Sequence, residues 1–217
     1  MGAITRAAAN NITTGGVILP SAINDASVAS VSSLAQVSAS DGITLISSQT
    51  ASNSSSVSFT SGIDSTYRTY LFKFINIHTL LNTDGFRFNM STDGGSNYNV
   101  IKTSSWFNAY HNENSTNPVL TYDGGNDLAQ SSSDQLIIRS MKSDSDSNGS
   151  GYMYLFNPSS TTYVKHFMSN SNNVQFEDYS QNYMMAGYAN TTSAINAIIF
   201  RMGTGNFSGT IHMYGIA

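Results

Sequence analysis

The stretch YRTYLFKFINI, residues 67–77, indicates the fold class of this 217-residue chain. Aromatic and β-branched side chains dominate it, which is typical of a β-strand. Because side chains alternate between the two faces of a strand, one face should carry rings and the other aliphatic groups. The first set is Tyr70, Phe72 and Phe74, and the second is Leu71, Ile75 and Ile77. Both faces are apolar, so we expect this strand to lie in the middle of a sheet.

Outward from this strand, most of the chain repeats the same period-2 pattern. Residues 85–91 place Phe86, Phe88 and Met90 on one face, and the turn signal DGG at 93–95 predicts a hairpin with a strand at 98–101. Further strands are expected at residues 43–48, 56–60, 105–110, 135–139, 152–157, 163–168, 183–188, 194–202 and 210–214. We therefore predict an all-β fold, an antiparallel jelly-roll-like β-sandwich of about eight or more strands over residues 42–217.

Residues 1–41 differ in composition from the rest of the chain. They contain no aromatic side chain and few charges, yet they carry enough aliphatic side chains to bury an apolar face. The prediction is an extended N-terminal attachment arm that orders against a partner. The alternative is plain disorder, although disordered segments usually have fewer apolar residues. The apolar residues assigned to the arm are Val17, Ile18, Leu19, Ile23, Val28, Val31 and Leu34.

Charged side chains are scarce over the whole sequence. They make up 10% of the residues, the net charge is −4, and the nine Lys and Arg are scattered singly. An ordinary soluble domain has about 25% charged residues. No basic stripe is available for phosphates or anionic lipid, so we expect no nucleic-acid binding and no membrane insertion. A surface with so little charge repulsion favours a homo-oligomer, with a homotrimer as the first choice.

The search for catalytic and metal-binding motifs yields one partial match. Residues 144–149 place Asp144, Asp146 and Asn148 at alternate positions of a calcium loop, but Leu155 stands where the closing carboxylate belongs. The alternatives are a calcium site and a polar hairpin loop, which we favour. The four histidines match no metal-binding spacing, and no Gly-x-Ser-x-Gly motif positions a serine nucleophile. We therefore predict a protein that is not an enzyme and that has no cofactor.

A cluster of aromatic residues remains as a candidate binding site. Tyr98, Trp106, Tyr110 and His111 lie close together in the sequence, among several asparagines. Aromatic rings can stack on sugar rings while amides bond the hydroxyl groups, so this mixture predicts a contact with a glycan. The alternative is that the rings fill the space between two sheets, which is the more usual role of residues such as Trp106.

Four stretches carry a resemblance to known proteins: TASNSSSVSFTSGIDSTYRTYLFKFINI (50–77), MSTDGGSNYN (90–99), LFNPSSTTYVKHFMSNS (155–171) and NTTSAINAIIFRMGTGNFSGTIHMYGI (190–216). Together they are similar to a module found in virion proteins of tailed phages, particularly phages of cyanobacteria and other marine bacteria. The N-terminal ITRAAANNIT (4–13) also resembles the attachment ends of short phage fibres. The resemblance implies a structural or fibre-like virion protein and supplies no catalytic residue.

Two classes of function follow. The first is a virion structural protein, either a short tail fibre or appendage or a capsid decoration protein, attached to other virion proteins by its arm and presenting the sandwich as a head. The second is a carbohydrate-binding module that recognises glycans of the host surface. A glycan-cleaving spike is a distant third, because such enzymes use paired carboxylates and a longer repetitive chain.

Overall fold

The computed structural model describes residues 42–114, 116 and 118–217. The attachment arm assigned to residues 1–41, with all the apolar residues attributed to it, lies outside the described residues. Within them the regular elements are β-strands, so the all-β prediction is confirmed. The part of the chain that is described contains no helix long and apolar enough to cross a membrane.

Twelve strands follow one another along the chain. They are β1 (Ile43–Ser54), β2 (Ser56–Phe59), β3 (Thr69–Thr79), β4 (Phe86–Ser91), β5 (Lys102–Asn112), β6 (Val119–Tyr122), β7 (Gln135–Ile138), β8 (Gly149–Phe156), β9 (Lys165–Gln175), β10 (Tyr179–Ala189), β11 (Ala197–Met202) and β12 (Phe207–Ile216). Several are longer than the apolar runs that predicted them. In β9, for example, the alternation of buried and exposed positions continues through serines and asparagines to Gln175.

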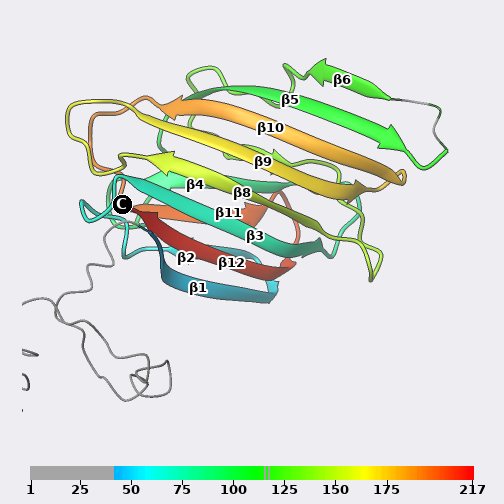
Figure 1. Ribbon diagram of the computed structural model, residues 1–217, viewed down its shortest axis with the longest axis horizontal. Helices are drawn as coiled ribbons and strands as arrows, with labels where there is room; N and C mark the ends of the chain where they lie inside the picture. The colour runs from blue at the N-terminus through cyan, green and yellow to red at the C-terminus, as the bar shows by residue number, and fades with distance from the viewer. Residues whose placement is uncertain (1–41, 115, 117) are drawn as a thin grey trace, which may run out of the picture. The chain divides into compact units, whose positions relative to one another are not determined.

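The strands form two antiparallel sheets that pack together as a β-sandwich (Figure 1). The large sheet has eight strands in the order β1-β12-β3-β8-β9-β10-β5-β6, and the small sheet has four in the order β2-β11-β4-β7. We set aside β5, β6, β9 and β10 and number the eight remaining strands 1 to 8 along the chain. Their order is then 1-8-3-6 in the large sheet and 2-7-4-5 in the small sheet. This is the strand order of a jelly roll. The predicted jelly-roll-like sandwich is confirmed, and β3 lies inside its sheet between β12 and β8, as its two apolar faces predicted.

The four additional strands extend the large sheet beyond the small one. β9 pairs with β8, β10 with β9, β5 with β10 and β6 with β5. We call these four strands the overhang. The small sheet ends at β7, which contacts β9 and the neighbouring part of β10, so the rest of the overhang has no strand opposite it. At the other edge of the large sheet, β1 pairs with β12 in a ladder that starts with Ile43 opposite Ile216.

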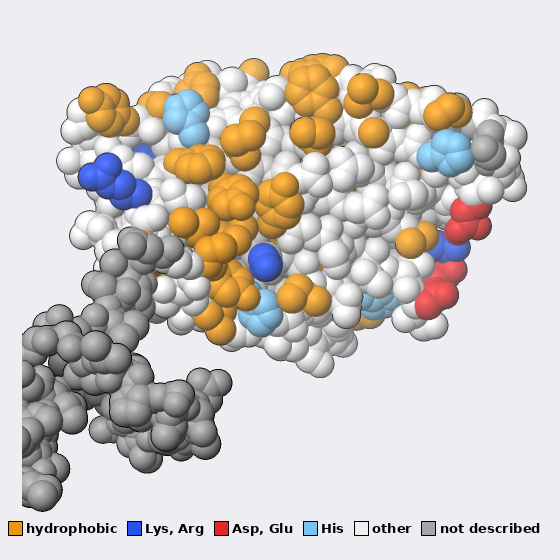
Figure 2. Space-filling model, in the orientation of Figure 1, with side chains coloured by type: hydrophobic (Ala, Val, Ile, Leu, Met, Phe, Trp, Pro, Cys, Tyr) orange, Lys and Arg blue, Asp and Glu red, His pale blue; other side chains and the backbone are white. Residues whose placement is uncertain are grey.

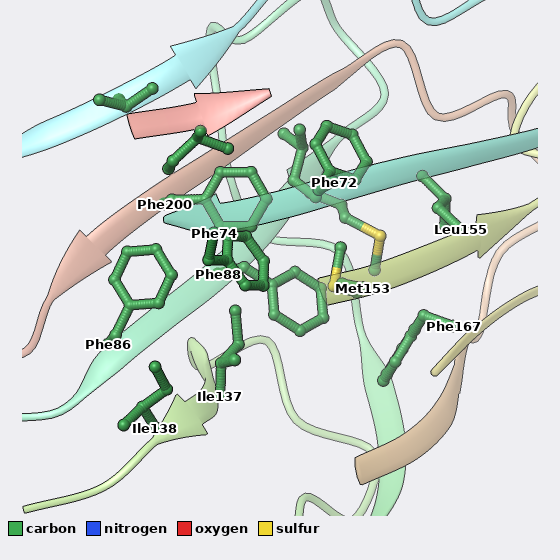
Figure 3. Close-up of a cluster of buried hydrophobic side chains, with 14 of the residues drawn as sticks. Phe72, Phe74, Phe86, Phe88, Ile137, Ile138, Met153, Leu155, Phe167 and Phe200 are labelled. Atoms are coloured by element: carbon green, nitrogen blue, oxygen red, sulfur yellow. The ribbon is translucent and has the colours of Figure 1, made fainter. Parts of the chain in front are cut away.

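Phe200 on β11 is the centre of the core between the two sheets. Its ring packs with those of Phe72, Phe74 and Phe86, at centroid distances of 5.4, 5.2 and 5.8 Å. Figure 3 shows these rings gathered with other buried side chains of both sheets. Aromatic pairs of this kind add about 0.5–1.5 kcal/mol each to the stabilisation from buried area. The inward faces of β3 and β4 are those that the alternation of residues 67–77 and 85–91 predicted.

The hairpin expected between residues 85–91 and 98–101 is absent. Gly94 and Gly95 do turn the chain, with φ angles of 72° and 91°. The segment that follows forms no strand, although the N–H of Val100 donates to the carbonyl of Met90 at 3.4 Å. The chain then crosses to the large sheet to begin β5. The turn was therefore predicted correctly and the pairing was wrong, because the partners of β4 are β11 and β7.

The orientation predicted for Ile77 is also wrong. Ile77 is fully buried in the core, on the same side as Phe74 rather than with the outward-facing Ile75. The cause is Asn76, whose φ of 52° belongs to a bulge that shifts the register between Phe74 and Ile77. A bulge inserts one residue into the alternation, so every position after it changes face.

One buried carboxylate holds the loop that joins β11 to β12. Asp84 accepts hydrogen bonds from the backbone N–H groups of Gly203, Thr204 and Gly205 at 2.9, 3.2 and 2.9 Å, and from that of Gly85 at 2.7 Å. Burial would raise the pKa of Asp84, but these N–H donors outweigh it and the pKa lies below its usual value. The carboxylate thus ties the start of β4 to the β11–β12 loop.

Candidate functional site

A cleft of about 440 Å³ opens on the inner side of the overhang, where the small sheet no longer covers it. Residues at every second position of β5 and β10 face inward and line this cleft, namely Asn108 and Tyr110 from β5 and Tyr179 and Gln181 from β10. The two strands are paired with Tyr110 opposite Gln181. The volume lies within the range of about 300–1,000 Å³ that small-molecule sites occupy.

Two tyrosine rings and two buried amides form the floor of the cleft. The rings of Tyr110 and Tyr179 meet edge to face with their centroids 5.3 Å apart. Asn108 and Gln181 are 4% and 7% exposed. The Oδ1 atom of Asn108 is buried and has no hydrogen-bond partner among the described residues. A buried acceptor without a donor costs about 1–3 kcal/mol, so this oxygen lowers the stability of the folded protein.

An ion pair borders the cleft. The Nη1 atom of Arg139, in the segment after β7, lies 2.7 Å from Oδ2 of Asp123, in the segment after β6. The backbone carbonyl of Arg139 accepts a hydrogen bond of 2.6 Å from the hydroxyl of Tyr183 on β10. Burial raises the pKa of Tyr183, so this phenol stays protonated and keeps donating at any physiological pH. The ion pair is therefore anchored to the overhang and adds charged donors and acceptors to the tyrosine and amide floor.

Trp106 lies in the core and does not line the cleft. It is fully buried, and its ring packs against that of Tyr183 with centroids 5.0 Å apart. Its predicted contact with a glycan is corrected, because the ring has no exposed surface on which a sugar could stack. The sequence favoured a place for Trp106 between two sheets. The structure buries it in the core, but on β5, in the part of the large sheet that has no strand of the small sheet opposite it.

Tyr98 and His111 also lie away from the cleft. Successive residues of a strand face opposite sides, so His111 lies on the outer side of the large sheet and Tyr110 on the inner side. Tyr98 precedes β5, in the segment after β4, and its hydroxyl lies close to Gly95. Most of the length of β5 separates it from Tyr110. Of the four residues predicted to contact a glycan, Tyr110 is the one that lines the cleft.

Three functional residues of the cleft escaped the sequence analysis. Tyr179, Gln181 and Arg139 belong to segments far from Tyr110 in the chain, and they meet it through strand pairing and the loop after β7. The available signal was the alternation in YSQNY, residues 179–183, where a glutamine stands between two tyrosines on one face. A polar residue at an inward position of a strand indicates that this part of the face is not sealed in a core.

The outer face of the large sheet is a second candidate surface. Strand pairing places apolar side chains in rows across it, with Leu71 of β3 opposite both Tyr154 of β8 and Tyr214 of β12. Figure 2 shows hydrophobic side chains gathered over this face, with few charged ones among them. We call this surface the outer band. Its residues are Leu45, Leu71, Phe107, Tyr152, Tyr154, Met168, Met184 and Tyr214.

Several side chains of the outer band are well exposed. Met168, Met184 and Tyr152 have 53%, 55% and 42% of their surface accessible. Lys73 brings a positive charge into the band, and its Nζ lies 5.6 Å from the ring centroid of Tyr214. Its aliphatic stem adds to the apolar surface while the ammonium group stays in water.

The calcium-loop motif forms a turn before β8. The backbone carbonyl of Asp144 accepts the N–H of Ser147 at 2.9 Å, and Oδ2 of Asp144 pairs with Nζ of Lys142 at 2.9 Å. The carboxylate that would be the first calcium ligand is thus already bound to a cation. No group of three or more His, Cys, Asp or Glu side chains within residues 42–114, 116 and 118–217 is placed to hold a metal ion.

Comparisons of the chain with protein-family models, with curated proteins and with solved structures find no match. The resemblance to phage virion modules therefore stays a prediction from the sequence. The cleft and the outer band are the two surfaces from which a function can be argued.

Proposed function

We propose that this chain is a structural subunit of a phage virion, either a short tail fibre or appendage or a capsid decoration protein. In this proposal residues 1–41 attach it to other virion proteins, and the β-sandwich is the head that it presents. The supporting observation is the outer band, because a contiguous exposed apolar patch usually marks a contact with another molecule. Jelly rolls occur in both capsid proteins and lectins, so the fold is compatible with the proposal and does not select it.

The partner that the outer band fits best is another copy of the chain, with a homotrimer as the first choice. The band is contiguous over several neighbouring strands and has little charge that an interface would have to desolvate. Met168 and Met184 are about half exposed, so covering either one completely contributes roughly half of the 1.5–3 kcal/mol gained by burying a fully exposed side chain.

The oligomer is tested by light scattering on the full-length chain. We expect a stable trimer for the natural sequence and a shift toward monomer for Met184→Lys, which places a charge in the outer band. Ser180→Lys is the matched control, because Ser180 is exposed on the same face of the same strand but outside the band. A monomeric natural chain, or two variants that behave alike, would contradict the use of the outer band.

The place in the particle is tested separately by labelling. Gold-tagged subunits seen on the head would indicate a decoration protein, and subunits seen at the neck or tail would indicate a fibre or appendage. Particles that never carry the subunit would rule out the virion role.

A second candidate function, binding of host-surface glycans, is favoured by the cleft. The paired rings of Tyr110 and Tyr179, the amides that line the cleft and the Arg139–Asp123 ion pair make up a combination that suits a sugar. Rings pack on the C–H face of a pyranose, and amides and charged groups bond its hydroxyls. The two functions are compatible, because the cleft and the outer band lie on opposite sides of the large sheet.

Glycan binding is tested on a glycan array with the full-length protein. We expect binding to be lost in Tyr110→Ala and kept in Tyr163→Ala, which removes an exposed ring outside both the cleft and the outer band. If both variants keep the same binding pattern, or if the natural chain binds no glycan, the cleft is not a sugar site.

A further inference from the structure

Lys102 is a fully buried lysine at the start of β5. Its Nζ donates hydrogen bonds to Oδ1 of Asn89 at 2.7 Å and to the backbone carbonyl of Val100 at 2.6 Å. Among the described residues its Nζ forms no ion pair with a carboxylate. Burial lowers the pKa of Lys102 to about 8, against an opposing effect of Asp134. Much of this amine is therefore uncharged, and so nucleophilic, in mildly alkaline solution.

The side-chain amide of Asn89 lies between this amine and a carboxylate. Its Nδ2 donates to Oδ1 of Asp134 at 3.0 Å, and its Oδ1 also accepts the backbone N–H of Met90 at 2.9 Å. Asp134 is fixed by Nε and Nη2 of Arg201 at 2.6 and 2.8 Å. Oδ1 of Asn89 thus accepts hydrogen bonds from the amine of Lys102 and from the N–H of Met90, while Nδ2 of the same amide donates to the carboxylate of Asp134.

The amine is close enough to the amide carbon for a reaction. A C=O bond is about 1.23 Å long, so the Cγ atom of Asn89 lies no more than about 3.9 Å from Nζ of Lys102. Reacting atoms in a near-attack arrangement are about 3–3.5 Å apart, and a fixed arrangement of this kind replaces an encounter in solution. Both residues are buried, at 0% and 1% exposure, so water does not compete for the amide.

We propose that Lys102 and Asn89 form an isopeptide bond within the chain. The uncharged Nζ of Lys102 attacks Cγ of Asn89, and the N–H of Met90 stabilises the oxygen as negative charge develops on it. Once Nζ is bonded to Cγ it shares that carbon with Nδ2, so Asp134, which already accepts from Nδ2 at 3.0 Å, takes up the proton that Nζ loses and delivers it to Nδ2 of Asn89. A bond forms between Nζ and Cγ, the bond between Cγ and Nδ2 breaks, and ammonia leaves. The reaction needs no oxidant, reductant or cofactor.

The position of this bond gives it a structural role. Asn89 lies on β4 in the small sheet and Lys102 on β5 in the overhang. The bond would join the two sheets covalently and close the segment that crosses between them. A cross-link of this kind stabilises the folded state by restricting the unfolded chain.

Lys165 shows that a buried lysine does not by itself lie next to a side-chain amide. It is also fully buried, and burial lowers its pKa. Its Nζ donates to the backbone carbonyls of Thr191 and Ser193 at 3.0 and 2.7 Å, and no side-chain amide contacts it among the described residues. Attack on either carbonyl would cut the chain, so Lys165 serves as the control.

Mass spectrometry of tryptic peptides from the full-length chain tests the bond directly. Trypsin does not cleave after an acylated lysine, so a cross-linked chain yields residues 88–139 as one peptide, lighter than its sequence by one ammonia. An unmodified chain yields residues 88–102 at their full mass. Fragment ions of the natural protein locate the bond, so this measurement does not depend on a variant that folds.

Three variants complete the test. Lys102→Met should keep the full intact mass, and Lys165→Met should lose one ammonia as the natural chain does. Asp134→Asn, which keeps both reacting groups, should stay unreacted or react at least about tenfold more slowly, as expected when an acid–base group is removed. The proposal is overturned if trypsin releases residues 88–102 after prolonged alkaline incubation. It is also overturned if the ammonia is lost from Asn148, before Gly149, or in Lys102→Met.

Discussion

The inner face of the large sheet has two parts that differ in chemistry although they share one alternation of side chains. Opposite the small sheet, β3 contributes Phe72 and Phe74 to a sealed aromatic core. In the overhang, the equivalent inward positions of β5 and β10 carry Asn108, Tyr110 and Gln181. The difference is whether a second sheet lies opposite. The inward side chains of β3 opposite the small sheet are apolar rings, whereas along the cleft, which no strand covers, amides and tyrosines form the floor.

The largest effect on stability is expected in the aromatic core opposite the small sheet. Phe200→Ala removes a ring that packs against at least three others, and we expect the free energy of unfolding to fall by about 3–5 kcal/mol. Urea unfolding followed by tyrosine and tryptophan fluorescence measures it. A loss below about 1 kcal/mol would mean that the core does not depend on contact between the sheets.

The second largest effect on stability is expected at Asp84, whose carboxylate holds the loop between β11 and β12 by hydrogen bonds. Asp84→Asn should lower stability at neutral pH by about 2 kcal/mol, because an amide cannot accept all the N–H donors that the carboxylate satisfies. The pKa of Asp84 is depressed in the folded state, so its stabilisation is present above the unfolded-state value and is lost as pH falls through the folded-state value. Urea midpoints from neutral pH to about pH 2 should therefore converge for the two proteins. A constant difference over that range would show that the charge of Asp84 is irrelevant.

A smaller effect of opposite sign is expected in the cleft. Asn108→Leu replaces a buried amide whose oxygen has no partner with an apolar side chain of similar size, and it should raise stability by about 1 kcal/mol. Thermal unfolding measures the gain, and a glycan array should show reduced binding. A destabilised variant would mean that Asn108 is satisfied in the folded protein, for instance by bound water.

The smallest effect on stability is expected at Tyr110, and it compares the packing of the cleft with that of the aromatic core. Tyr110→Ala removes a ring that is half-buried beside an open cleft, so we expect a loss below about 1 kcal/mol, well under that of Phe200→Ala. Both variants can be measured in the same urea titration. Equal losses would show that the overhang is as tightly packed as the sandwich.

Alternation of side chains made most of the fold predictable, and its failures have physical causes. The faces of β3 and β4 follow from their sequences, whereas Ile77 was misplaced because Asn76 adopts a left-handed conformation that no alternation indicates. β6 was missed because its residues are exposed and leave no burial pattern. The pairing of β4 was misjudged because a turn signal does not say whether the chain returns to the same sheet.

The candidate site was less predictable than the fold. Tyr110 stood out as an aromatic residue among asparagines, but the same reasoning selected Trp106, which faces the same side and is fully buried in the core. What covers each inward position decides between core and cleft, and this cover depends on strand order and on loops such as the one after β6, whose Asp123 N–H donates to the carbonyl of Trp106. The pair Lys102 and Asn89 was not noticed, because lysine and asparagine in a polar sequence give no sign of burial.

The pairing of Ile43 with Ile216 has a consequence for the protein under tension. A pull on residue 43 directed away from β12 loads the ladder from one end, so its backbone hydrogen bonds break one after another. A ladder peeled in this way yields at a lower force than one sheared along its length. Because β1 is the outermost strand of its sheet, it can detach while β12 still shields β3 and the rings around Phe200. A subunit held by its N-terminal side would then lengthen by one strand and keep its head folded.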